Sequence, residues 1–208
     1  MKPILFLRAL GQGAVSFPLQ PTAGAVVSRR VYDLPELDLQ AFGAILVSAH
    51  TDQRALAACD RQLVGFLDAG GVLVFNGHLA YPFLPELQVF VPVDGRGLGA
   101  LQVRRCAEHP VFDGVDPKDL TFRRGVAGFY GRGSNPPPPG AEVLHTLSGS
   151  NAPLDWLWQR PGGGLVFMHA GNDLWMYSGD SSSAARMTPQ LLAWLFRCIA
   201  GNAERRRA

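Results

Sequence analysis

The sequence predicts a single α/β domain over residues 1–208, built around a mainly parallel β-sheet. Four short apolar runs, at residues 3–7, 44–48, 72–75 and 165–169, have the unbroken hydrophobicity of strands that are buried on both faces. A helical pattern of apolar residues lies between the second and third runs. The chain has 208 residues, 47% hydrophobic and 17% charged, so it can bury one core of ordinary size.

The helix between the second and third runs is expected over residues 54–68. Thr51 or Asp52 can cap its start. Gly70-Gly71 can end it, because glycine readily adopts the left-handed conformation found after helices. A strand, a helix and a second strand in this order form a βαβ unit, whose crossover is right-handed. We therefore expect the four apolar runs to be parallel neighbours in one sheet, with this helix packed on one face.

Four further segments have the pattern of strands. Residues 25–32 carry charge, which is typical of an edge strand. Residues 86–106 alternate between apolar and polar side chains, which predicts antiparallel strands or a hairpin added to the sheet. Residues 142–147 and 154–159 are expected to be strands as well.

The remaining predicted elements are a proline-rich segment and a terminal helix. Residues 135–140 are expected to form a rigid surface connector, because their four prolines cannot donate to a β-ladder. The final helix is expected over residues 188–200. Thr188-Pro189 suits its start and Gly201 suits its end.

Four segments, taken in order, carry a family resemblance. They are the opening strand with its Gly-rich loop, the segments Phe66–Val74 with Asn76–Ala80, the segment His109–Val115, and the strand Gly164–His169. Together they resemble the class I glutamine amidotransferase-like superfamily, in particular its trehalose-utilisation-like branch. The resemblance implies a flavodoxin-like three-layer sandwich with a mainly parallel sheet and an antiparallel extension.

Glutaminases of that superfamily use a Cys on a tight turn after a strand, with a His and a Glu two residues apart after the last strand. The corresponding turn here, Phe75–His78, has no thiol, and Cys59, Cys106 and Cys198 are expected elsewhere as buried small hydrophobic residues. His169 matches the family His, but Gly171 stands at the position of the Glu. Because the nucleophile and its orienting acid are both missing, we expect no glutaminase activity.

Polar residues follow each of the four predicted parallel strands. Ligands of open α/β sheets bind beyond the carboxyl ends of such strands, so these residues are expected to form a site. His78 and His169 are the candidate catalytic residues, because neutral imidazole is a common general base. The candidate ligand-binding residues are Gln12, His50, Asp52, Asn76, Asn172 and Asp173.

Each cluster also has a structural explanation. His50 and Asp52, after the second strand, can cap the following helix. Asn76 and His78, after the third strand, can satisfy backbone groups in a tight turn. Gly171-Asn172-Asp173 is itself a good turn sequence.

Two further groups of residues, three histidines and three arginines, bear on the binding of charged ligands. A metal site from His50, His78 and His169 would require three loops to meet within ~2.1 Å of one ion, so we expect no metal, and we expect no cofactor. Arginines at positions 123, 124 and 132 flank a short apolar strand. They can clamp an anionic group over the site, or they can lie in a solvated loop.

The expected function is a non-catalytic ligand-binding or interaction module whose partner is a small polar molecule. The alternative is a hydrolase or isomerase of a small polar metabolite such as a sugar, using His78 and His169. A net charge of +2 does not favour nucleic acid, and no stretch approaches the ~20 apolar residues of a membrane span. The opening apolar run is too short for a signal peptide, so we expect a cytoplasmic protein, and homo-oligomer formation is left open.

Overall fold

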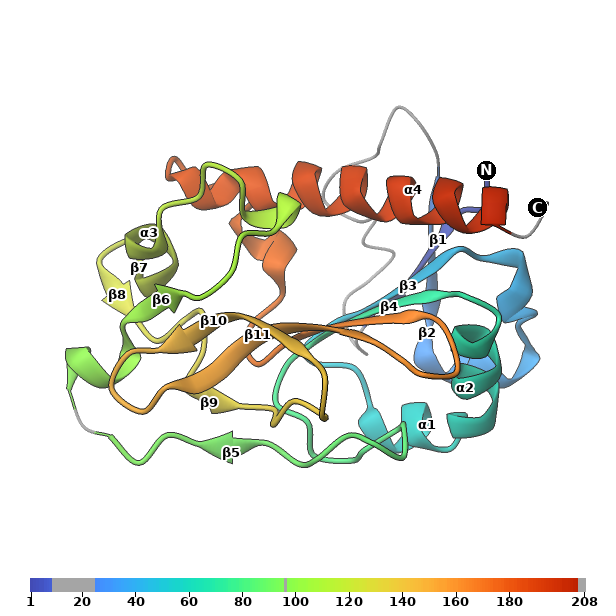
Figure 1. Cartoon of the computed structure of the whole chain (residues 1–208), viewed down its shortest axis with the longest axis horizontal. Helices are drawn as coiled ribbons and strands as arrows, with labels where there is room; N and C mark the ends of the chain where they lie inside the picture. Colours follow the sequence, from blue (N-terminus) through green and yellow to red (C-terminus); the bar gives the residue numbers. More distant parts are fainter. Residues whose placement is uncertain (9–24, 96, 206–208) are drawn as a thin grey trace.

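The computed structural model describes residues 1–8, 25–95 and 97–205, which form an α/β fold around an eight-stranded sheet (Figure 1). The strand order in this sheet is β2-β1-β3-β4-β12-β11-β10-β6. Its strands are β1 (Ile4–Arg8), β2 (Val26–Arg30), β3 (Ala44–Val47), β4 (Val72–Asn76), β6 (Val103–Arg105), β10 (Glu142–Leu147), β11 (Ala152–Gln159) and β12 (Leu165–His169).

The first five strands in this order are parallel. β1 pairs with β2 and β3, and β4 pairs with β3 and β12, all in parallel. The four predicted apolar runs are therefore parallel neighbours in one sheet, as expected. β2 lies at the edge of the sheet, which confirms the prediction made from its charged residues.

The other half of the sheet is antiparallel. β12 pairs with β11, β11 with β10, and β10 with β6, each in antiparallel orientation. β12 therefore has a parallel neighbour on one side and an antiparallel neighbour on the other. The predicted strands at 142–147 and 154–159 are both present, and the second begins two residues earlier, at Ala152.

Residues 86–106 were predicted to form antiparallel strands or a hairpin added to the sheet, and this is confirmed only for β6, which pairs with β10 in antiparallel orientation. β5 (Val91–Pro92) lies outside the main sheet and pairs with β9 (Gly133–Ser134), while only β6 joins the main sheet. Val91 is 53% exposed, and Pro92 has no N–H to donate, which suits a short pairing outside the main sheet. A second small sheet pairs β7 (Phe122–Arg123) with β8 (Val126–Ala127).

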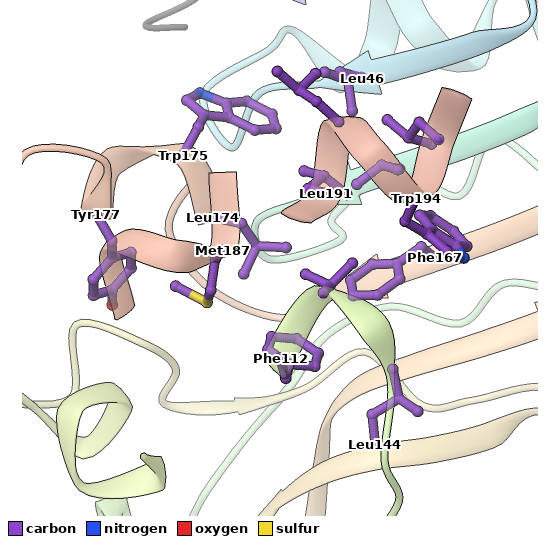
Figure 2. Close-up of a cluster of buried hydrophobic side chains, with 14 of the residues drawn as sticks. Leu46, Phe112, Leu144, Phe167, Leu174, Trp175, Tyr177, Met187, Leu191 and Trp194 are labelled. Carbon is purple, nitrogen blue, oxygen red and sulfur yellow. The ribbon is translucent and has the colours of Figure 1, made fainter. Parts of the chain in front are cut away.

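Helices cover both faces of the main sheet, which gives three layers (Figure 1). α4 (Met187–Arg205) packs on one face, and Figure 2 shows its Leu191 and Trp194 facing Phe167 of β12 and Phe112. α1 (Gln53–Ala57) and α2 (Asp60–Asp68) pack on the other face. The remaining helix is α3 (Pro117–Thr121), and 3-10 turns are η1 (Val31–Glu36), η2 (Leu39–Ala41), η3 (Leu98–Leu101), η4 (Pro110–Phe112), η5 (Leu174–Tyr177) and η6 (Ser183–Arg186).

Two helices differ from their predicted bounds. The helix expected over 54–68 is divided into α1 and α2, because the Cys59 N–H bonds to the Leu56 carbonyl three residues back and tightens the chain there. The last helix does not end at Gly201 but continues to Arg205. An isolated glycine inside a helix costs only about 1 kcal/mol, and the buried Ile199 shows that the apolar face continues to this point.

Two further sequence expectations need correction. Asn135, expected on a surface connector, is 1% exposed and belongs to the interior. Cys106, expected to be buried, is exposed beyond the end of β6, whereas Cys59 is buried and Cys198 is half-buried. Across the described residues, we find no helix with the length and apolar character of a transmembrane segment.

Candidate functional site

A hollow of about 260 Å³ lies beyond the carboxyl ends of the parallel strands β3, β4 and β12. This carboxyl-edge pocket is the place at which an open α/β sheet binds its ligands. Its lining comes from the loops after these strands and from the loop after β8, and consists of Ala49, His50, Gly77, His78, Gly128, Phe129, Gly131, Arg132, Gly171 and Asn172. Three predicted site residues, His50, His78 and Asn172, line it, and Gln12 lies outside the described residues.

Asn76 holds the turn after β4 in place. It is fully buried, its side-chain N–H donates to the Val47 carbonyl at 3.0 Å, and its side-chain oxygen accepts from the Leu174 N–H at 3.2 Å. It therefore joins the ends of β3 and β4 to the start of η5. Both of its polar side-chain atoms are used in this way, and Asn76 is not among the residues that line the pocket, so its observed role is to support the turn.

Gly77 makes the turn tight. Its φ of +114° is a conformation that side-chain-bearing residues rarely adopt, and a Cβ there would lie 2.9 Å from the Ala49 carbonyl oxygen. Asn135 fixes the same turn from the far side: its amide donates to the Gly77 carbonyl at 2.8 Å and accepts from the Leu79 N–H at 2.9 Å. The turn is therefore rigid, and it carries no nucleophilic side chain.

His78 and His50 are exposed residues of the pocket lining. The His78 ring stacks on Phe90 with centroids 3.7 Å apart. Burial, and to a smaller degree repulsion from His169, lowers the pKa of His78, which favours a neutral imidazole. His78 is therefore placed as predicted, at the mouth of the site, and it is held by an aromatic neighbour.

The two predicted carboxylates, Asp52 and Asp173, each accept hydrogen bonds from a backbone N–H and from a hydroxyl group. Asp52 caps α1 by accepting from the Arg54 N–H at 2.9 Å, and it also accepts from the Tyr32 hydroxyl at 2.7 Å. Asp173 accepts from the Ser48 hydroxyl at 2.8 Å and from the Ala49 N–H at 2.7 Å, and burial raises its pKa. Neither residue is among the residues that line the pocket, and their predicted role in ligand binding stays a prediction.

His169 lies beneath the pocket and not in it. Its side chain is fully buried and its Nδ1 is 2.6 Å from Asp155 on β11, the residue paired with it in the register of the two strands. The same carboxylate contacts His145 Nδ1 at 2.9 Å and accepts from the Tyr130 hydroxyl at 2.6 Å. We call these four residues the buried carboxylate network.

The electrostatics of the network fix its hydrogen-bond directions. Burial alone would raise the pKa of Asp155, but the His169 charge and the hydrogen bonds from both imidazoles hold it below its usual range. Burial also raises the pKa of Tyr130 well above its ordinary value, so this phenol keeps its proton. An ionised carboxylate only accepts, so both imidazoles donate from Nδ1, and within the described residues neither Nε2 has a hydrogen-bond partner.

Gly171 separates His169 from the pocket. A Cβ at this position would lie 1.7 Å from the Tyr130 carbonyl oxygen and 2.7 Å from His169 Nε2, so only glycine fits. An acidic side chain therefore cannot stand at position 171. The carboxylate that contacts His169 comes instead from Asp155 on the neighbouring strand.

Asp155, His145 and Tyr130 were missed from the sequence. Asp155 carried one usable signal: it is a charged residue in the middle of the apolar run Leu154–Trp158, and a buried charge requires partners. His145 and Tyr130 carried no such signal, because the contact of His145 with Asp155 depends on the pairing of β10 with β11, and that of Tyr130 depends on the loop between β8 and β9.

The arginines divide into two groups. Arg123 and Arg124 both pair with Asp180, at 2.7 Å and 3.0 Å. Arg132 lines the pocket, where its Nε donates to the Gly128 carbonyl at 3.2 Å. Asn172 also lines the pocket and donates to the Phe129 carbonyl at 2.9 Å.

In residues 1–8, 25–95 and 97–205, no group of three or more His, Cys, Asp or Glu is arranged to hold a metal ion.

Comparison with known proteins gives little to add to this geometry. No protein-family model and no curated protein matches the chain. Among solved structures, the chain is similar to one described as "mmIFT52 N-terminal domain", with a TM-score of 0.47 and 12% sequence identity. The alignment covers 92% of this chain and 96% of that chain. A likeness at this level identifies neither a family nor a function.

Proposed function

We propose that this chain is a non-catalytic module that binds a small polar molecule in the carboxyl-edge pocket, on a flavodoxin-like fold of the class I glutamine amidotransferase-like kind. The observation that carries the proposal is the pocket lining, in which His50, His78, Arg132 and Asn172 come from separate loops to one hollow. A larger hollow of about 480 Å³ lies elsewhere, near both ends of the described chain, and no His or Arg is among its described lining residues.

The absence of a nucleophile from the lining supports a binding role. Among the described residues, no Cys, Ser or Thr lines the pocket, so the acyl-enzyme chemistry of glutaminases has no atom there on which to proceed. Gly77 and Gly171 stand at the turns where the chemistry would be expected, and both are packed too closely to carry a side chain.

A thermal-shift screen of the chain against a panel of small metabolites, with divalent metals included, tests the proposal. A ligand that binds only the folded state raises the melting temperature by mass action. His78→Ala should weaken binding of any hit by about 1–3 kcal/mol, the usual loss when a polar partner is removed. It should leave the fold intact, because His78 is an exposed loop residue.

Two outcomes would contradict the proposal. One is a hit whose affinity is unchanged by His78→Ala, since the ligand would then bind away from the pocket. The other is unfolding of the His78→Ala chain, which would make His78 a structural turn residue. A variant of the same size at an exposed position away from the pocket, Arg104→Ala, serves as the matched control.

The second candidate is a hydrolase or isomerase of a small polar metabolite such as a sugar, using His78 and His169. The 2.6 Å contact between Asp155 and His169 favours it, because a carboxylate at Nδ1 is the arrangement that orients a general base. Incubation with a panel of nitrophenyl glycosides and esters separates the two candidates. Turnover that is lost in both His169→Gln and His78→Ala favours the enzyme, whereas a ligand recovered unchanged favours the binding module.

A cytoplasmic location and self-association remain proposals. The three cysteines are all free, which suits a reducing compartment. Size-exclusion chromatography with light scattering measures the oligomeric state directly.

A further inference from the structure

We infer that the ligand of the carboxyl-edge pocket carries a compact oxyanion, a phosphate or carboxylate group, held by Arg132 and by backbone N–H groups of three loops. This inference rests on the proposed function, because it assigns the chemical class of the ligand in the same pocket. Charge, unpaired backbone donors and the packing of the glycines each support it.

The fixed charge of the lining is positive. The lining includes Arg132 and, among the described residues, no carboxylate. The neighbouring acids are already engaged: Asp173 bonds to Ser48 and Ala49, and Asp180 pairs with Arg123 and Arg124. Within the described ranges, Arg132 therefore has no carboxylate at salt-bridge distance.

Arg132 is also oriented. Its Nε donates to the Gly128 carbonyl at 3.2 Å, which fixes one side of the planar guanidinium. The two terminal nitrogens remain for a ligand, and their geometry matches the paired oxygens of a carboxylate or phosphate.

Backbone donors come from the loops after β3, β4 and β12. No hydrogen-bond acceptor exists, among residues 1–8, 25–95 and 97–205, for the N–H groups of His50, His78, Gly171 and Asn172. All four residues line the pocket. Backbone N–H groups that converge from several loops are a common means of binding anions.

The glycines bring these loops into backbone contact. A Cβ at Gly77 would meet the Ala49 carbonyl at 2.9 Å, and one at Gly131 would lie 3.2 Å from the Ala170 carbonyl. Without side chains, these residues leave the backbone itself as the wall of the pocket. The backbone atoms closest to Gly77 and Gly131 are carbonyl oxygens, so the donors for a compact anion are the four N–H groups named above and the Arg132 guanidinium.

Isothermal titration calorimetry of the whole chain tests the inference with inorganic phosphate and acetate, and with glucose as a neutral probe. We expect at least one anion to bind and glucose not to bind, and the stronger of the two anions identifies the group. Arg132→Gln should weaken anion binding about tenfold or more, as expected for a lost charge-assisted hydrogen bond. Arg124→Gln is the matched control, because Arg124 is 75% exposed and does not line the pocket.

Amide NMR provides a second readout that needs no variant. On titration with the bound anion, the N–H signals of His50, His78, Gly171 and Asn172 should move more than those elsewhere. Equal weakening by Arg132→Gln and Arg124→Gln, or amide shifts confined to other regions, would overturn the inference. Binding of glucose or another neutral metabolite at the pocket, with no anion bound, would overturn it while leaving the proposed function standing. No binding by any probe or panel member would remove both.

Discussion

The carboxyl-edge pocket and the buried carboxylate network lie next to each other, but their polar side chains differ in exposure to solvent. In the pocket, His50, His78 and Arg132 face solvent and come from loops. In the network, Asp155 and His169 are fully buried on neighbouring strands. The difference separates residues that are available to a ligand from residues that set the shape of the site, although both sets cluster at one end of the sheet.

Removing the central carboxylate should have the largest effect. Asp155→Ala leaves two imidazoles and a phenol without their shared partner, and breaking a buried charged network costs about 3–5 kcal/mol of unfolding free energy. Urea denaturation followed by circular dichroism measures the loss. Asp52→Ala, which removes a half-buried helix cap, should lower stability much less. Equal losses for the two variants would mean that burial does not distinguish the two regions.

His109 shows what burial does to an imidazole that has no carboxylate partner. Burial is the main cause that lowers its pKa to about 4; Asp155 opposes the change, while His145 and Arg197 add to it. In the unfolded chain, His109 is protonated as the pH falls below about 6.5, whereas in the folded chain it stays neutral until about pH 4. The free energy of unfolding therefore falls as the pH drops through this window.

His109→Asn should flatten this pH dependence. Asn keeps a side-chain acceptor for the Val111 N–H at the start of η4 but does not titrate. At 1.36 kcal/mol per pKa unit, the difference between the two proteins across the window reaches at most about 3 kcal/mol. Urea titrations at several pH values between 4 and 7 measure it. Parallel curves for the two proteins would show that His109 is not responsible.

The glycine between the two regions offers a smaller test. Gly171→Ala places a Cβ 1.7 Å from the Tyr130 carbonyl, so the loop must move, at a cost of about 1–3 kcal/mol. The same variant should weaken ligand binding, because Gly171 lines the pocket. Gly179→Ala is the matched control, since a Cβ there meets nothing within 4 Å. If Gly171→Ala behaves like Gly179→Ala, the two regions are not coupled through this residue.

The sequence predicted the parallel half of the fold well because its information is local. Each apolar run, such as Val72–Phe75, specifies a buried strand by itself, and a strand that leads into a helix implies a parallel neighbour. Residues 86–106 were misread in part because alternation does not specify a partner, and Pro92 instead pairs with Gly133 in a separate small sheet.

The site was predicted in position but not in the division of roles. His50, His78 and Asn172 do line the pocket, since the carboxyl ends of parallel strands meet at one edge. The sequence could not show that Asp52 and Asp173 accept hydrogen bonds from nearby N–H and hydroxyl groups, or that Asp155 contacts His169. These contacts depend on loop conformation and on the register between β11 and β12.

The position of β12 in the sheet also determines the order in which the chain can complete its fold. β12 is central in space but late in the chain, so β4 has a bare edge until residues 165–169 have been synthesised. β11 likewise waits for β12 on one side. A nascent or truncated chain that ends before this strand exposes an apolar edge of the kind that drives aggregation. Residues 165–169 are therefore the segment that joins the parallel half of the sheet to the antiparallel half.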